Sequence, residues 1–192
     1  MHGWWTASYL VLWMLVIVLS VVVVALARQI GTLHMRLGPR GALEMDDEGP
    51  PLGEATEARE VSDLAGATVR LGGPGRQQLI LFVSPGCGVC EQVLPALPAI
   101  ARNGQLVPYV VTDVDNTEAE LAFGRRNIPA PLISAPDLIQ RYNVPGTPYV
   151  VITDRLGIVR AKGTVNNLEQ VEGLVDTARR RAKEAANEVQ VS

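Results

Sequence analysis

The longest apolar run in the chain lies near its N-terminus. Residues 3–27 contain no charged side chain, and residues 9–27 read YLVLWMLVIVLSVVVVALA, with hydroxyls only on Tyr9 and Ser20. At about 1.5 Å per residue, a helix over such a run crosses a hydrocarbon layer of about 30 Å. The pattern predicts one transmembrane helix over residues 9–27. Residues 1–8, which include two tryptophans, are expected to form an interfacial segment.

A cleaved signal peptide is the alternative to a lasting anchor. Such a peptide has a basic first region, a shorter apolar core and small residues at its cleavage site. The first eight residues, MHGWWTAS, hold no Lys or Arg, and Arg28-Gln29-Ile30 follow the apolar run. We therefore predict an uncleaved helix that holds the protein in a lipid bilayer by a single span.

The charges beside the predicted span favour one orientation. Arg28, Arg36 and Arg40 follow the span, whereas only the amino terminus and His2 precede it as possible cations. By the positive-inside rule alone, the part of the chain after the helix would be cytoplasmic.

The pattern changes after residue 27. Residues 28–59 begin with a juxtamembrane stretch that could extend the helix, break at Gly38-Pro39, and continue as an acidic segment rich in Gly and Pro. That segment has too few large apolar residues to pack alone, so we interpret it as a linker that holds the following domain off the bilayer.

Residues 60–182 show the pattern of a folded α/β domain. The run QLILFV at residues 78–83 is apolar almost throughout, as in a strand that is buried on both faces. Further strands are expected over residues 61–64, 68–71, 106–113, 149–152 and 158–161, and helices over residues 90–103, 118–126 and 134–142. A last helix should begin at the caps Asn166-Asn167 and bury one face, made of Leu168, Val171, Leu174, Val175 and Ala178. The order predicts a mixed central sheet flanked by helices, with residues 183–192 as a C-terminal tail.

Composition narrows the classes of function. The chain has 17 Lys and Arg against 20 Asp and Glu, a net charge of −3, which does not suit a nucleic-acid-binding surface. Its two cysteines are too few for a secreted framework of several bridges. A bridge between residues 87 and 90 would close a very short loop and add little stability. A chemical role therefore explains this cysteine pair better than a role in stabilising the fold does.

The two cysteines stand between the buried strand and the next helix, in SPGCGVC at residues 84–90. At a helix N-terminus, free backbone N–H groups and the helix dipole stabilise a thiolate. The motif predicts Cys87 as the nucleophile and Cys90, one turn later, as the thiol that resolves the mixed disulfide. Pro95 should kink the helix that follows.

Other chemistry for the pair finds less support. A zinc site needs two more ligands, yet there is no third cysteine, and His2 and His34 both precede the domain. A copper carrier of the thioredoxin class would need a later His, which the chain lacks. Ser84 has the offset at which a thiol peroxidase carries a Ser or Thr, so that alternative stays open, as does a pair of inert buried cysteines. We predict no metal and no cofactor.

A second element, VPGTPY at residues 144–149, directly precedes an apolar strand. A Pro at the first residue of a strand forfeits no necessary N–H group. If the Thr147–Pro148 peptide bond is cis, the backbone of Thr147 can face the cysteines and pair with an extended substrate chain. Thr147 and Pro148 are thus the predicted substrate-binding residues.

Together, the two elements resemble the thioredoxin superfamily over roughly residues 50–165. Cys87, Cys90, Pro95 and Pro148 fall at the positions of that family's motif. The segment at residues 126–142 and the hairpin at residues 61–71 are similar to those of membrane-tethered, extracytoplasmic thioredoxins of the TlpA and ResA kind. The resemblance implies a thioredoxin-like fold and thiol–disulfide exchange.

A closer resemblance, over nearly the whole length, is to the MauD family of methylamine-utilization proteins. It is carried by residues 28–43, by VSDL and LGGP within residues 61–74, and by SPGCGVC. It implies disulfide formation or isomerisation on the small (β) subunit of periplasmic methylamine dehydrogenase, and a membrane redox partner that resets the cysteines. Because lasting disulfides need an oxidising compartment, we expect the domain on the periplasmic side, against the positive-inside count.

The chain departs from these patterns at three positions. Gly88 replaces the Pro of the MauD motif, Leu81 replaces the buried acid of cytosolic thioredoxins, and Gly86 replaces the Trp that usually precedes the first cysteine. The last two changes favour a specialised partner over general reduction. Alternative functions are reduction of disulfides in cytochrome c maturation, a chaperone-like module that binds the immature subunit without turnover, and a structural membrane adaptor.

Overall fold

The computed structural model describes residues 3–36, 47–124 and 126–191. The chain divides into two compact units, Met1–Arg40 and Gly41–Ser192. In the first unit, the described residues form one helix, α1 (Gly3–Arg36), which contains the predicted helix over residues 9–27. The stretch Gly3–Val22 is long and apolar enough to cross a membrane.

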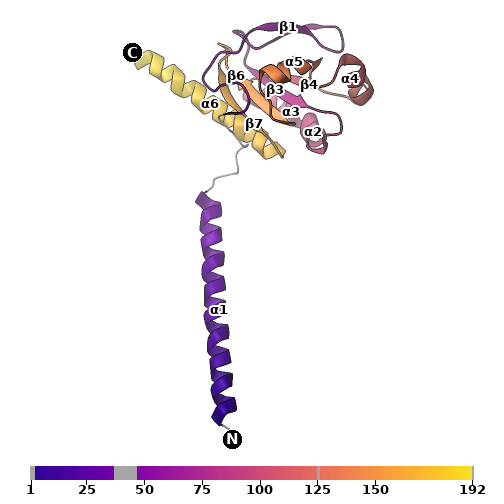
Figure 1. The fold of residues 1–192 in the computed structure, drawn as a ribbon. Helices are drawn as coiled ribbons and strands as arrows, with labels where there is room; N and C mark the ends of the chain where they lie inside the picture. Colours follow the sequence, from indigo (N-terminus) through magenta and orange to yellow (C-terminus); the bar gives the residue numbers. More distant parts are fainter. Residues whose placement is uncertain (1–2, 37–46, 125, 192) are drawn as a thin grey trace. The chain divides into compact units, whose positions relative to one another are not determined.

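The second unit is a layered α/β domain (Figure 1). Its elements are β1 (Arg59–Ser62), β2 (Thr68–Leu71), β3 (Gln78–Val83), α2 (Gly88–Val93), the 3₁₀ turn η1 (Leu94–Ala96), α3 (Leu97–Gly104), β4 (Val107–Thr112), α4 (Asn116–Phe123), β5 (Leu132–Ser134), α5 (Pro136–Arg141), β6 (Tyr149–Thr153), β7 (Val159–Thr164) and α6 (Leu168–Val191). Five strands form a sheet in the order β5-β4-β3-β6-β7, and β1 pairs with β2 as a separate ribbon. Because β3 runs parallel to β4 and antiparallel to β6, the sheet is mixed, as the sequence predicted.

Strand β3 lies at the centre of the sheet and is buried on both faces. Leu79, Leu81 and Val83 pack in one apolar cluster with side chains of α2, α3 and α6. Ile80 and Phe82 point to the other face and pack with side chains of α5 and of the β1–β2 ribbon. This two-sided burial explains why residues 79–83 of the strand are apolar without alternation.

The helix after the cysteines is broken at Pro95, as expected. Helix α2 ends at Val93, the 3₁₀ turn η1 contains Pro95, and α3 resumes at Leu97. A proline ring has no N–H group and clashes with the preceding turn, so it interrupts the regular α-helical hydrogen bonds.

The arm, by which we mean residues 47–58, differs from the predicted linker. Its backbone pairs with β7, since Gly53 N–H donates to the Val159 carbonyl and Val159 N–H donates to the Glu54 carbonyl, both at 2.9 Å. The Glu48 carbonyl accepts the Tyr149 hydroxyl at 3.1 Å and the Lys162 ammonium at 2.6 Å. The linker prediction for residues 28–59 is therefore wrong for the arm. It failed because an arm that is held by backbone hydrogen bonds needs few apolar side chains.

Other elements depart from the prediction at their ends. Strand β5 was not predicted, and the helix expected over residues 134–142 is shortened to α5. Helix α6 continues to Val191, so the predicted tail is helical as far as the structure describes it (Figure 1). Four of the five predicted inward positions of α6 are buried, whereas Leu168 is exposed. Asn167 caps the helix, as expected, by accepting the Gln170 N–H at 2.9 Å.

Candidate redox site

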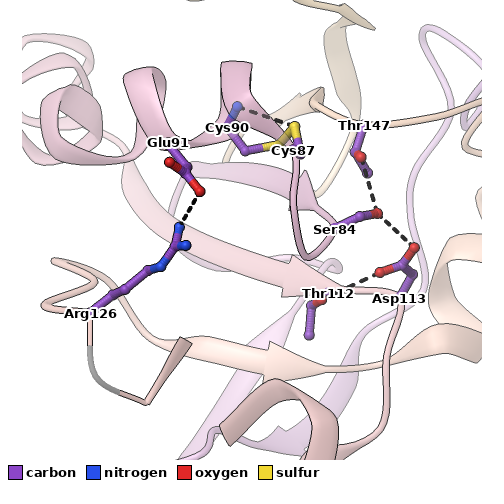
Figure 2. The surroundings of a disulfide bond; sticks show 8 residues. All are labelled: Ser84, Cys87, Cys90, Glu91, Thr112, Asp113, Arg126 and Thr147. Carbon is purple, nitrogen blue, oxygen red and sulfur yellow. Dashed lines mark hydrogen bonds and ion pairs between the residues drawn. A yellow bond between two sulfur atoms is a disulfide. The ribbon is translucent and has the colours of Figure 1, made fainter. Parts of the chain in front are cut away.

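The two cysteines form a disulfide at the junction of β3 and α2. Cys87 is the N-cap residue of α2 and has an extended backbone, which turns the chain from the strand into the helix. The Cys87 sulfur accepts the N–H of Cys90 at 3.2 Å, and the Cys87 N–H donates to the Ser84 carbonyl at 3.3 Å. Figure 2 shows the disulfide at the start of the helix.

The two cysteines differ in accessibility. Cys90 is only 1% exposed and belongs to the apolar cluster that contains Leu79 and Leu81. Cys87 is partly exposed and packs at the margin of this cluster. A molecule that approaches from solution therefore meets Cys87 first.

The glycine before the first cysteine has a backbone reason. Gly86 has a φ of +76°, a left-handed conformation that a side chain disfavours, while a Cβ built there would meet no atom within 4 Å. The Trp that many thioredoxins carry at this position would be strained by the backbone. Gly88 is the first residue of α2, and a Cβ there would also meet no atom within 4 Å.

The loop before β6 approaches the cysteine loop. The Thr147–Pro148 peptide bond is cis, as predicted, and Pro148 is buried. The Pro148 carbonyl accepts the Val165 N–H at 3.1 Å. The Thr147 hydroxyl donates to the Ser84 hydroxyl oxygen at 3.0 Å, so the structure brings Thr147 beside the loop that carries the cysteines (Figure 2). Substrate binding by Thr147 and Pro148 stays a prediction.

Asp113 is a site residue that the sequence analysis missed. Its carboxylate accepts the Ser84 hydroxyl at 2.6 Å and lies 3.5 Å from the Thr112 hydroxyl (Figure 2). Ser84 and Asp113 directly follow β3 and β4, two parallel neighbours in the sheet. Because parallel strands end at the same edge, this placement was a usable signal for their contact.

An exposed ion pair lies beside the cysteines. Arg126 Nη1 is 2.7 Å from Glu91 Oε1, and Glu91 directly follows Cys90. Both side chains are nearly half exposed, so water and salt screen the pair and its contribution to stability is small.

The buried surroundings of Cys90 are apolar. Leu81, which stands where cytosolic thioredoxins have a buried acid, is fully buried in the same cluster as Cys90. Among the residues that the structure describes, no group of three or more His, Cys, Asp or Glu is placed to hold a metal ion.

A cavity of about 650 Å³ lies between the arm and α5, away from the cysteine loop. Tyr142 lines this cavity, and burial raises the pKa of its hydroxyl above 10.0. Beside the cavity, the hydrogen bond from Arg59 holds the pKa of Asp137 below 3.8. Neither Ser84, Thr147 nor a cysteine lines the cavity, so it is separate from the redox site.

The domain has a thioredoxin-like fold that carries a bonded Cys-x-x-Cys pair at the start of the helix after its central strand. The fold is similar to that of the exposed lipoprotein thioredoxin of Streptococcus pneumoniae, with a TM-score of 0.55, 18% identity, and 65% of this chain and 99% of that one covered. The thioredoxin domain of a thiol-disulfide oxidoreductase from Bacteroides vulgatus has a TM-score of 0.53 and 20% identity over 67% of this chain and 96% of that one. At these identities, the similarity supports the fold.

Sequence relatives define the family. No protein-family model matches the chain. The methylamine utilization protein MauD of Methylobacillus flagellatus is 34% identical over 180 residues, which cover 90% of this chain and 86% of that protein. MauD of Paracoccus denitrificans is 33% identical over 177 residues, with 90% and 88% covered. The chain therefore belongs to the MauD family of methylamine utilization proteins.

Proposed function

We propose that this protein is a membrane-anchored thiol–disulfide oxidoreductase that forms or isomerises disulfides on the small (β) subunit of methylamine dehydrogenase. The proposal is carried by the unequal exposure of two bonded cysteines at the start of α2, in a chain of the MauD family. One sulfur can meet a client protein, and the other is held behind it.

Cys87 is the nucleophile in this proposal, and Cys90 is the resolving thiol. The Cys90 N–H group already points at the Cys87 sulfur, and this donor favours negative charge on that sulfur when the disulfide is reduced. Burial shields Cys90 from client proteins, so its accessible reaction partner is the Cys87 sulfur one turn away.

In the oxidising direction, a client thiolate attacks the Cys87 sulfur and the Cys87–Cys90 bond breaks. Cys90 leaves as a thiolate that takes up a proton. A second client thiolate then attacks the client sulfur of the mixed disulfide and releases Cys87. The client loses two electrons and two protons and gains one disulfide, and the protein ends as a dithiol. A disulfide-bearing membrane redox partner then takes the two electrons and restores the bond.

In the isomerising direction, the reduced protein begins the exchange. The Cys87 thiolate attacks a wrongly paired client disulfide and forms a mixed disulfide, while one client thiolate leaves. A different client thiolate then displaces Cys87 and forms the new bridge. This cycle transfers no net electrons, so it needs no redox partner while the protein stays reduced.

Thr147 and Pro148 bind the client in this proposal. Pro148 begins the segment that leads into β6, and the Thr147 side chain contacts the cysteine loop. An extended client chain beside this loop can pair with the main-chain groups of Thr147, as peptides do when they add to an exposed strand.

Helix α1 is the proposed membrane anchor, with the redox domain on the periplasmic side. The length and apolar composition of Gly3–Val22 support the anchor. Lasting disulfides in the proposed client need an oxidising compartment, while the arginines after the span favour the opposite side. A C-terminal fusion to a reporter that works only in the periplasm should show activity. Activity of a C-terminal fusion to a reporter that works only in the cytoplasm would refute this placement.

The test is to replace the chromosomal gene with Cys87→Ser and Cys90→Ser variants and grow the cells on methylamine. We expect the small subunit to carry unpaired or wrongly paired cysteines, detected by thiol alkylation and mass spectrometry. Glu120→Ala, at an exposed acid of α4, is the matched control and should give normal bridges. Normal bridges in both cysteine variants would instead support a binding module without turnover. Normal bridges after deletion of the gene would refute the assignment to this subunit.

A further inference from the structure

Three loops at one edge of the sheet are joined by side-chain hydrogen bonds. Ser84 follows β3, Asp113 follows β4, and Thr147 precedes β6, and these three strands are neighbours in the order β4-β3-β6. The Thr147 hydroxyl donates to Ser84 at 3.0 Å, and the Ser84 hydroxyl donates to Asp113 at 2.6 Å (Figure 2).

The direction of these bonds follows from the carboxylate at their end. An ionised Asp113 can only accept hydrogen bonds, so the Ser84 proton must point toward it. The distance of 2.6 Å is typical of a hydroxyl bonded to a carboxylate, the stronger kind of hydrogen bond. The Ser84 oxygen then presents its lone pairs to Thr147, which becomes the donor. The charge of Asp113 thereby fixes the orientation of both hydroxyls.

Ser84 also contacts the cysteine loop. Its carbonyl accepts the N–H of Cys87 at 3.3 Å, while its hydroxyl holds Thr147. One residue therefore links the backbone of Cys87 to the side chain of Thr147, and Asp113 sets the direction of that link.

We propose that Asp113 is a positioning residue which, through Ser84, fixes the client-binding loop at Thr147 relative to the Cys87 sulfur. This inference rests on the proposed function, because it assumes that a client chain pairs with Thr147 while its sulfur reacts with Cys87. The bonds of the Asp113 side chain run to the hydroxyls of Ser84 and Thr112, so it acts on the loop and does not touch the reacting sulfur.

The experiment compares two probes that carry the same reactive disulfide. One probe is an octapeptide of Gly and Ala with a central cysteine bonded to thionitrobenzoate, and the other is 2-mercaptoethanol, which has no amide group, bonded to the same group. The reduced full-length protein in detergent attacks either probe through Cys87 and releases coloured thionitrobenzoate, and Cys90 then displaces the thiol of the probe. The leaving group is identical, so the two rates differ through the peptide backbone that can pair with Thr147.

We expect Asp113→Ala to raise the half-saturating concentration of the octapeptide about tenfold, as the loss of a hydrogen bond to a charged group implies. The maximal rate should stay unchanged, and the rate with the small probe should stay within about twofold of the wild-type value. Asp113→Asn should retain most of the octapeptide affinity, because its amide oxygen still accepts the Ser84 hydroxyl. Glu120→Ala removes one exposed negative charge elsewhere and should change neither rate.

Thr147→Val gives an independent test if Asp113→Ala folds poorly. It keeps the branched shape, removes the hydroxyl that donates to Ser84, and should raise the half-saturating concentration of the octapeptide. Equal slowing of both probes by Asp113→Ala would show an action on the cysteines and overturn the inference, as would unchanged octapeptide kinetics in both variants. A wild-type protein that releases thionitrobenzoate from neither probe would overturn the proposed function, and the inference with it.

Discussion

One hydrogen-bond network lies on each side of Pro148 in the sequence, and the two networks differ in burial. The outer network consists of Asp113, Ser84 and Thr147, whose side chains are exposed or partly exposed. The inner network consists of Tyr149 and Lys162, both 0% exposed, which donate to the Glu48 carbonyl of the arm. Thr147 and Tyr149 flank Pro148, so each network holds one side of the same short segment.

The difference in burial separates stability from activity. A buried polar group that loses its partner costs about 1–3 kcal/mol, because water cannot replace the lost bond. Where water can reach the site, it takes over much of the lost bond. We therefore expect changes to the inner network to lower the free energy of unfolding, and changes to the outer network to alter client exchange.

Removal of the arm should have the largest effect. A fragment of residues 59–192 lacks the Glu48 carbonyl, which leaves two buried donors without this acceptor, and lacks the backbone partners of Val159. Its free energy of unfolding should be lower by about 3 kcal/mol or more than that of a fragment of residues 47–192. Urea denaturation followed by circular dichroism measures the difference. Equal midpoints for the two fragments would show that the arm does not stabilise the domain.

A methyl group at Gly49 should have the next largest effect. Gly49 has a φ of +72°, and a Cβ there would overlap the Tyr149 hydroxyl. Gly53 has a φ of +80°, but a Cβ there would meet no atom within 4 Å. Gly53→Ala should therefore cost about 1 kcal/mol from the backbone alone, and Gly49→Ala about 2–3 kcal/mol. Equal losses in thermal or urea denaturation would show that contact between the arm and Tyr149 contributes nothing.

Loss of one hydroxyl should have a smaller effect. Tyr149→Phe removes the donor to Glu48 and keeps the ring, so we expect a loss of about 1 kcal/mol in the free energy of unfolding. Tyr109→Phe is the same chemical change on β4 at a partly buried ring and should leave stability nearly unchanged. Both variants should exchange disulfides at the wild-type rate. A slowed exchange in Tyr149→Phe would mean that the inner network also positions the client.

The outer network should have the smallest effect on stability. Ser84→Ala removes a partly exposed hydroxyl, so the free energy of unfolding should fall by no more than about 0.5 kcal/mol. The same variant should lose octapeptide affinity as Asp113→Ala does, because it breaks the same link to Thr147. A loss of stability as large as that of Tyr149→Phe would remove the distinction between the networks.

Much of the domain could be predicted because its signals are local. The apolar run of β3, the break at Pro95, the cap at Asn167 and the cysteine pair each depend on residues close together in sequence. The cis bond before Pro148 followed from a short motif placed before a strand.

The missed features depend on contacts between distant residues. The arm is held on the domain largely by backbone carbonyls and N–H groups, which every non-proline residue carries. Its sequence therefore shows no pattern that predicts the contact with the domain. Lys162 is fully buried on β7, a position that composition alone assigns to the surface. Strand β5 has three residues and lies just after prolines, too short a stretch to show a period. Asp113 could be linked to Thr147 only once the neighbouring strands were known.

The burial of Cys90 constrains the order of events in a catalytic cycle. Since Cys87 is the one of the two cysteines that is open to solution, the proposed client and the proposed partner that resets the cysteines must react with the same sulfur in turn. Neither can occupy the site while the other is bonded there, so no ternary complex forms at the sulfur. Steady-state turnover should then follow a ping-pong scheme, with parallel double-reciprocal plots when one co-substrate is varied at fixed levels of the other.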